Sequence, residues 1–172
     1  MEFTLRGVPM PLWVRTAVPM TDEELIRLSA ANDILRIERE PDGELSIRPI
    51  QGSVAGAINV EVMMQLHDWI DTGGGGEIVG ADAGFALPDG SVRAASLAWV
   101  RSARFEGVPR EQREGFLPLC PDFVVEIRGF SDSREYIEWK MRQWMENGTE
   151  VGWLIDPEEK TGGGRGGCVA RG

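Results

Sequence analysis

The apolar and polar positions of the N-terminal third follow a helical pattern and then an alternating one. Thr21 and Glu24 have the spacing of a capping box, in which each side chain accepts a hydrogen bond from the other residue's backbone amide. A short helix is therefore predicted to begin at this point. Alternating runs at residues 34–39 and 45–48 flank a Pro-Asp-Gly turn sequence, and this arrangement predicts a β-hairpin.

The middle of the chain predicts a long helix followed by short strands. Residues 54–71 carry apolar side chains at helical spacing, and the four glycines at 73–76 end the helix because glycine has little helical propensity. Strands are then predicted at residues 77–79, 84–87 and 97–101. The polar stretch that follows, residues 102–119, is expected to hold one short helix near 109–113.

The segment from Pro121 to Pro157 predicts a strand, an amphipathic helix and a second strand. Side chains alternate along the first strand, so Glu126 shares a face with Val124 and Arg128. The helix is expected to begin near residues 131–133, with Asp132 and Glu135 at capping-box spacing and Gly148 as part of its C-cap.

Glu126 and Lys140 are the first candidates for chemistry. At about 100° per residue, Lys140 lies at the edge of the helix's apolar stripe, near Ile137 and Trp144, from where it can reach the end of the sheet. A buried glutamate beside a lysine is costly unless it is paired, binds metal or takes part in catalysis. From the residues alone, Glu126 is also compatible with a solvated strand position. Lys140 is compatible with a side chain that extends its charged end to the surface.

Composition restricts the class of protein. A chain of 172 residues with 42% hydrophobic content fits one globular domain. Two cysteines without a CxxC motif and one histidine provide neither a zinc site nor a disulfide framework, so we expect a cytoplasmic protein. The prolines of the N-terminal region exclude a signal peptide and a membrane span there. The net charge of −10 counts against DNA binding, which depends on Lys and Arg, without excluding it.

Three regions are predicted along the chain. Residues 1–20 are expected to form an extended lead-in, residues 21–160 the folded domain, and residues 161–172 a glycine-rich flexible tail. The order of elements within the domain favours a central mixed sheet with helices on its faces, an α/β architecture.

Several motifs in order resemble the Uma-two family of predicted restriction endonucleases, part of the PD-(D/E)XK nuclease superfamily. They are LRIEREPDGELSI, GAIN, GFALPDGSVR, PDFVVEIRGFSDS, KM, NG and GWLIDP, and they span most of the chain. The resemblance implies a restriction-endonuclease-like fold that cleaves DNA with Mg²⁺ or Mn²⁺. It also implies that Glu126 ligates the metal and that Lys140 positions or activates water, while Arg128 takes the place of the usual ExK lysine.

One departure from the family pattern concerns the second metal ligand. Where the family has a Pro-Asp pair within VRxPDxxWV, this chain reads VRAASLAWV, so Ser96 stands where the metal-binding aspartate is expected. Asp122 is not a substitute, because it lies about 13 Å from Glu126 along an extended strand, whereas Asp82 and Asp89 of the upstream loops stay open as alternatives. We therefore interpret the chain as a degraded or repurposed member of the family, with weak nuclease activity at best.

Two further readings stay open from the residues. Arg128 has the spacing to pair with Glu126 along one strand face, and Glu38 and Glu44 of the hairpin are expected at the surface, although the family often has an acidic residue near its first strands. The rival function is a non-catalytic interaction protein, expected to be a homodimer, that uses exposed tryptophans and methionine-rich helices.

Overall fold

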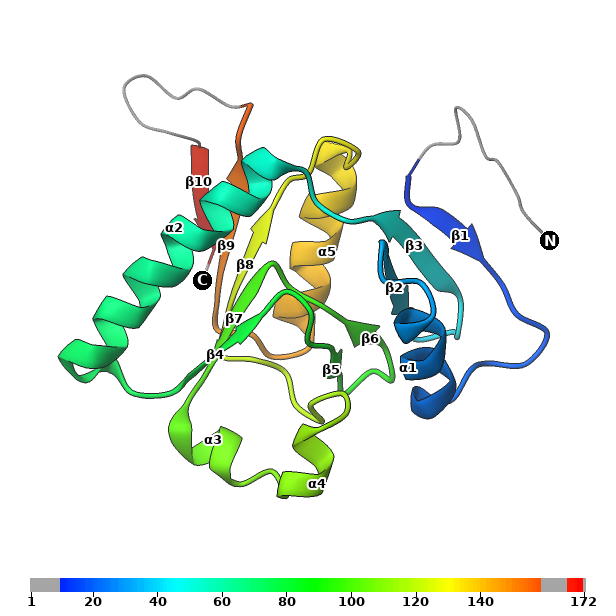
Figure 1. Ribbon diagram of the computed structural model, residues 1–172, viewed down its shortest axis with the longest axis horizontal. Helices are drawn as coiled ribbons and strands as arrows, with labels where there is room; N and C mark the ends of the chain where they lie inside the picture. Colours follow the sequence, from blue (N-terminus) through cyan, green and yellow to red (C-terminus); the bar gives the residue numbers. More distant parts are fainter. Residues whose placement is uncertain (1–9, 159–166, 172) are drawn as a thin grey trace.

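The computed structural model describes residues 10–158 and the backbone of residues 167–171. Two five-stranded sheets stand side by side with helices around them (Figure 1). The first sheet is antiparallel and has the order β1 (Leu12–Val14), β3 (Leu45–Pro49), β2 (Leu35–Arg39), β6 (Val92–Arg93) and β5 (Phe85–Ala86).

The second sheet is mixed and forms the centre of the molecule. Its order is β10 (Gly167–Arg171), β9 (Val151–Asp156), β8 (Phe123–Ile127), β7 (Leu97–Val100) and β4 (Glu77–Gly80). β8 and β9 are parallel, and the other neighbours are antiparallel. The helix α5 (Arg134–Glu146) makes the crossover that a parallel pair requires.

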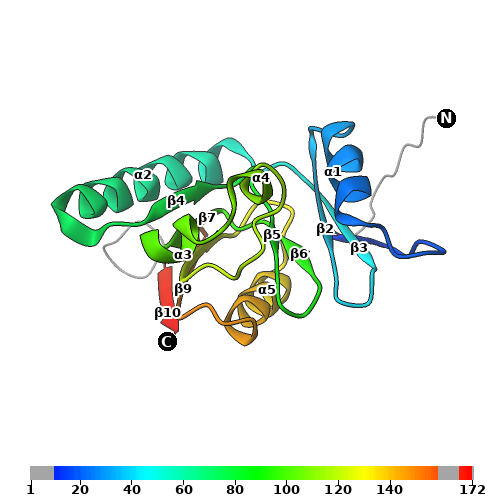
Figure 2. The same cartoon turned by 90° about the horizontal axis from the view of Figure 1, so that it is seen from below.

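Two helices cover opposite faces of the second sheet (Figure 2). Val125 and Ile127 of β8 pack toward α2 (Ser53–Trp69), which a π-helical turn, Ile70–Gly74, extends. Val124 packs on the other face with Ile137, Met141 and Trp144 of α5. Glu126 lies between Val125 and Ile127 in the strand, so alternation directs it to the α5 face.

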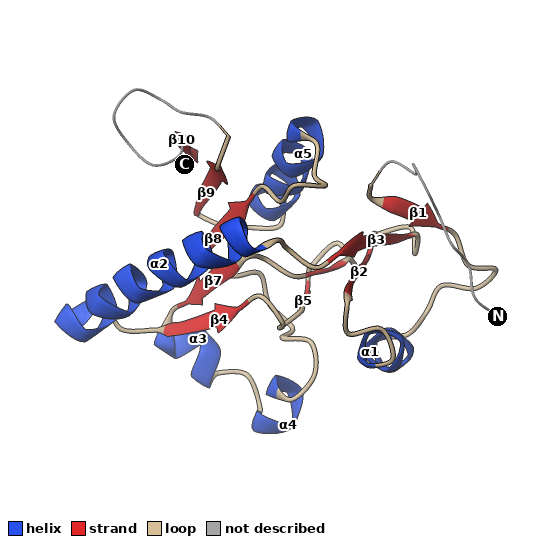
Figure 3. Cartoon of the chain, turned by 45° about the horizontal axis from the view of Figure 1, so that its top comes forward, coloured by secondary structure: helices blue, strands red, loops and turns tan. Residues whose placement is uncertain are grey.

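The first sheet and α1 (Asp22–Ala30) lie to one side of the second sheet (Figure 3). Leu25 of α1 packs against Leu45 and Val92 of this sheet. The predicted capping box is confirmed, because Thr21 and Glu24 accept hydrogen bonds from each other's amides. The predicted hairpin of β2 and β3 is confirmed as well.

The structure differs from the prediction in how the strands are grouped and in several local elements. The hairpin belongs to the first sheet rather than to the central one, because its strands pair with β1 on one side and, through Arg39–Val92, with β6 on the other. The short strands β1 and β6 and the helix α3 (Ser102–Glu106) were not predicted, whereas α4 (Arg110–Arg113) was. At α5, Ser133 rather than Asp132 caps the helix by accepting from the Tyr136 amide, and Asn147 with Gly148 ends it as predicted.

The C-terminal segment also departs from the flexible tail that the glycine content predicted. Residues 167–171 form β10, which pairs with β9 from Gly167–Asp156 to Arg171–Gly152. Residues 161–166 and 172 of that prediction, like residues 1–9 of the lead-in, lie outside the described residues.

A candidate nuclease site closed by an ion-pair network

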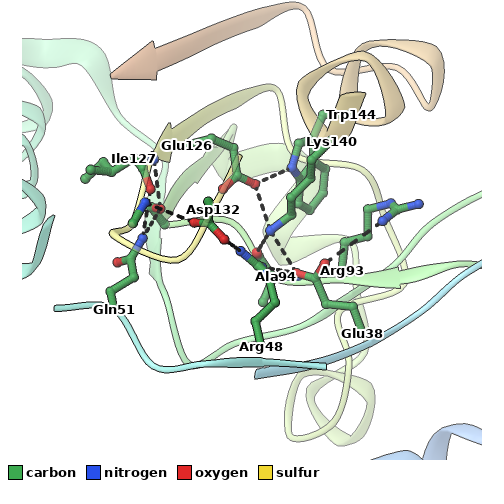
Figure 4. A network of polar contacts seen from close by, with 12 residues as sticks. Glu38, Arg48, Gln51, Arg93, Ala94, Glu126, Ile127, Asp132, Lys140 and Trp144 are labelled. Atoms are coloured by element: carbon green, nitrogen blue, oxygen red, sulfur yellow. Dashed lines mark hydrogen bonds and ion pairs between the residues drawn. The ribbon is translucent and has the colours of Figure 1, made fainter. Parts of the chain in front are cut away.

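Glu126 of β8 faces two side chains of α5 in a buried polar cluster (Figure 4). Its Oε1 lies 3.1 Å from Nζ of Lys140 and accepts a hydrogen bond of 2.7 Å from Nε1 of Trp144. Glu126 is 2% exposed and Lys140 is fully buried. The structure thus brings together the two residues that the sequence singled out, and solvation of Glu126 and surface extension of Lys140 are both ruled out.

Lys140 has three oxygen neighbours, each from a different segment. Besides Glu126, its Nζ contacts Oε1 of Glu38 at 2.8 Å and donates to the carbonyl oxygen of Ala94 at 2.7 Å. The ammonium group thus donates one hydrogen bond to a backbone carbonyl and forms ion pairs with two carboxylates.

Glu38 of β2 belongs to this cluster, and its expected surface position was wrong. The residue is 1% exposed, and its Oε1 accepts from the Ala94 amide at 3.0 Å as well as contacting Lys140. Burial alone would raise the pKa of Glu38, but the charges of Lys140, Arg48 and Arg93 outweigh burial and lower the pKa from 4.5 to about 2.

Arginines of the first sheet extend the network on the side of Glu38. Arg48 of β3 lies 3.4 Å from Oε1 of Glu38 and 3.4 Å from Oδ1 of Asp132. Arg93 of β6 donates to Glu40 at 3.2 Å and lies 4.0 Å from Oε2 of Glu38. The second oxygen of Asp132 accepts from the Gly129 amide, so this side chain fastens the loop before α5 instead of capping the helix.

Ser96 is buried beside β8, but its hydroxyl faces the strand's backbone. Oγ accepts hydrogen bonds of 3.1 Å from the amide of Ile127 and from Nε2 of Gln51, while Asn59 donates to the Ser96 carbonyl. Both lone pairs of the hydroxyl are therefore engaged. The structure places position 96 next to Glu126 without directing its oxygen at the Glu126 carboxylate.

Arg128 and Asp122 lie at the two ends of β8 and make other ion pairs. Nε of Arg128 is 2.8 Å from Oδ2 of Asp156, and its guanidinium also binds Glu158, rather than the Glu126 partner considered from the sequence. Asp122 is buried and binds Arg101 and Arg104. The role that the resemblance assigns to Arg128 stays a prediction.

The donor set does not fit a bound Mg²⁺, which proteins usually hold with one or two available carboxylates in addition to waters and phosphate oxygens. Ser96 offers a neutral oxygen whose lone pairs are taken, and Oε1 of Glu126 is engaged by Lys140 and Trp144. Among the described residues, no group of three His, Cys, Asp or Glu side chains has an arrangement that could hold a metal ion. The carboxylates are neutralised by side-chain cations instead.

A cleft of about 530 Å³ adjoins the network between α1, β2 and the loop before β5, and Glu38, Arg93 and Ala94 contribute to its lining. Its rim is acidic, with Asp33, Asp82 and Glu114 outnumbering Arg36. This rim repels a phosphate backbone more than it attracts one.

The sequence comparison identifies the family. Residues 22–161 match the Uma2 family, described as "Putative restriction endonuclease". The chain belongs to this family. The resemblance read from the motifs is thereby confirmed, and comparison with curated proteins finds no match.

A solved structure has a similar fold. The fold is similar to that of "a putative nuclease belonging to DUF820" from Anabaena variabilis, with a TM-score of 0.66 and 21% sequence identity. The match covers 82% of this chain and 76% of the other. The predicted α/β, restriction-endonuclease-like class is confirmed. Among the described residues, no helix is both long enough and apolar enough to cross a membrane.

Sequence reasoning found Glu126 and Lys140 but missed Glu38, Arg48 and Arg93. The alternation of β2 places Glu38 on one face of the strand and the apolar side chains on the other, and the polar face of such a strand is normally solvated. The available signal was charge complementarity, because acids at positions 38 and 40 are matched by arginines at 48 and 93. A single sequence does not reveal that these residues meet.

Proposed function

We propose that the chain has the framework of a DNA phosphodiesterase of the restriction-endonuclease type, with its Mg²⁺-dependent catalysis disabled. The observation that carries the proposal is the direct contact of Glu126 with Lys140, next to a position where Ser96 replaces the expected aspartate. The acid and the amine of a PD-(D/E)XK site are retained, and the second anionic ligand is missing.

The proposed loss of catalysis follows from the missing negative charge at position 96. Mg²⁺ bound by carboxylates lowers the pKa of a bound water and stabilises charge on the phosphate, and this is the chemistry that the ion supplies in nucleases. In this chain Glu126 would contribute one such carboxylate, and Arg128 would stand near the substrate at the end of β8. Because Ser96 is neutral, we expect the wild-type chain to hold Mg²⁺ or Mn²⁺ too weakly to support cleavage.

DNA is the proposed substrate class on the strength of the family, and the charge distribution argues for weak binding. The chain carries a net charge of −10, and the cleft next to Glu38 has an acidic rim. Affinity for DNA comes mainly from cationic contacts with phosphates. We therefore expect micromolar or weaker binding that falls further as salt concentration rises.

A plasmid cleavage assay with Mg²⁺ or Mn²⁺ tests the proposal. The wild-type protein is expected to leave supercoiled DNA intact, and Ser96→Asp is expected to nick it. The gain should vanish when Glu126→Ala is added to Ser96→Asp, which separates cleavage at this site from a contaminating nuclease. Robust wild-type cleavage that Glu126→Ala abolishes would show that the site is active and would overturn the proposal.

A second candidate function is a non-catalytic, homodimeric interaction protein on the nuclease fold. The observation in its favour is the outer face of α2, where Val54, Val60, Met63 and Met64 are 40–64% exposed. No Lys or Arg occurs within α2, so this face is unsuited to nucleic acid. Sedimentation velocity of the wild type and of Val60→Glu with Met64→Glu tests this function. A dimer that the double variant dissociates supports it, and a monomeric wild type refutes it.

A further inference from the structure

The place of Lys140 within the network suggests a role other than assisting water. Its nitrogen sits among three oxygens, Oε1 of Glu38, Oε1 of Glu126 and the carbonyl of Ala94, at 2.8, 3.1 and 2.7 Å. Carboxylate and carbonyl oxygens are the donors that hard divalent cations take in proteins. We infer that the ammonium group of Lys140 occupies the position of a cation in this site and acts as its permanent, covalently tethered substitute.

Charge balance supports this inference. Glu38 and Glu126 share the Lys140 ammonium, and Arg48 is a second cation, 3.4 Å from Glu38. A divalent ion entering between the two carboxylates would lie beside these cations in a region that water does not screen. The carboxylates are already compensated, so a metal ion would gain little from them and would meet strong repulsion.

The ammonium group of Lys140 is also shielded from solvent. Its nitrogen donates to the Ala94 carbonyl and contacts two carboxylates, and the side chain is fully buried. A lysine that orients or deprotonates a nucleophile needs a free N–H or an approach for substrate. In this chain the amine is a structural cation.

The tethered cation joins the two sheets. Glu38 comes from β2 of the first sheet and Glu126 from β8 of the second, while Lys140 projects from α5 between them (Figure 4). The ammonium thereby does what a bridging metal ion does, which is to hold carboxylates of separate elements at a fixed distance. It does so without depending on the supply of metal.

The experiment removes the tethered cation and asks whether a free one replaces it. Lys140→Met keeps an unbranched chain but leaves Glu38 and Glu126 uncompensated around the Ala94 carbonyl. We expect this variant to bind one Mn²⁺ at least a hundredfold more tightly than the wild type, as measured by electron paramagnetic resonance of free Mn²⁺ without DNA. The affinity should be lost when Glu126→Gln is added.

Arg142→Met is the matched control, because it removes the same charge from an exposed position of α5. It is expected to bind Mn²⁺ no better than the wild type. An increase in this control equal to that of Lys140→Met would show a general charge effect and overturn the inference. Folded Lys140→Met without added affinity would overturn it too, as would a wild-type Mn²⁺ site that Glu126→Gln abolishes.

Folding of the variant has its own readout. If Lys140→Met is unfolded without metal, recovery of its circular dichroism on addition of Mn²⁺ supports the inference, and failure to recover overturns it. The inference rests on the proposed absence of bound Mg²⁺ from the wild type, yet the two fail separately. Lack of cleavage by Ser96→Asp counts against the proposed function, whereas lack of Mn²⁺ binding by Lys140→Met counts against the tethered cation.

Discussion

The indole Nε1 of Trp144 donates a hydrogen bond of 2.7 Å to Oε1 of Glu126 inside the core. The same ring packs edge-on against Phe85 with 5.8 Å between centroids, so Trp144 contacts an apolar and a polar neighbour at once. Trp144→Phe keeps an aromatic ring and deprives a buried carboxylate of a donor. We expect a loss of about 2–4 kcal/mol in unfolding free energy from the unmade hydrogen bond and the smaller ring.

Urea unfolding of Trp144→Phe, followed by circular dichroism, measures this loss. Trp139→Phe is the control, since Trp139 lies on the same helix, half-buried against the Arg93 guanidinium. A smaller loss is expected there. Equal losses in the two variants would mean that the bond to Glu126 contributes nothing specific.

Stability should depend on pH through Glu38. Its pKa falls from 4.5 to about 2 in the folded chain, so its stabilising contribution is fully present above pH 4.5 and is lost as pH falls toward 2. The contribution is on the order of 3 kcal/mol at neutral pH. Glu38→Gln should therefore be much less stable than wild type at neutral pH, and the difference should shrink as the solution is acidified.

Chemical denaturation of both proteins across this pH range provides the measurement. A difference between the wild type and Glu38→Gln that stays constant from neutral pH to about pH 2 would mean that the charge of Glu38 is not what stabilises the fold.

Ser96→Asp should strengthen Mg²⁺ binding, because it adds a negative charge next to Glu126 that Lys140 does not neutralise. We expect binding that is undetectable for the wild type in isothermal titration calorimetry to become measurable, with a gain of at least tenfold. Ser96→Asn is the control of matched size without the charge. Unchanged affinity in a folded Ser96→Asp protein would show that position 96 is not a metal position.

Asp122 should matter for stability and leave metal binding untouched. It is buried at the start of β8, where it binds Arg101 and Arg104 and accepts from the Arg101 amide. Removing one partner of a buried ion pair costs about 3–5 kcal/mol when the other charge stays buried, and less here because both arginines reach solvent. We expect Asp122→Asn to lose roughly 2 kcal/mol.

The Asp122→Asn variant in a Ser96→Asp background should still bind Mg²⁺ as Ser96→Asp does. Calorimetry of the double variant checks this expectation. Loss of metal binding in a folded double variant would give Asp122 a role in the site.

Local chemistry explains which parts of the fold followed from the sequence. The capping box at Thr21, the hairpin turn, the glycine run after α2 and the Asn147-Gly148 helix end all depend on residues within a few positions of one another. The pairing of Glu126 with Lys140 was accessible for the same reason, since one strand and the next helix carry them. The family motifs then indicated that Ser96 stands where a metal-binding aspartate is expected.

Long-range contacts account for what the sequence did not reveal. Glu38 reaches the site because the polar face of the hairpin turns inward onto the second sheet, and alternation alone cannot distinguish a solvated polar face from one buried by ion pairs. The strand β10 was missed because glycine disfavours strands, while pairing along β9 supplies backbone hydrogen bonds from Gly167 to Arg171. In both cases tertiary context overrode local preference.

The single backbone pair between β2 and β6, Arg39 with Val92, has a consequence for how this chain can change over generations. With so little main-chain pairing at that junction, Arg93 of β6 holds it by ion pairs with Glu38 and Glu40 of β2, and Lys140 of α5 pairs with Glu38 as well. Losing one of these charges alone leaves its partners uncompensated in the core, and Lys140 has a second partner in Glu126. Descendants of this sequence should therefore alter positions 38, 126 and 140 together, and a change at one of them alone should be rare.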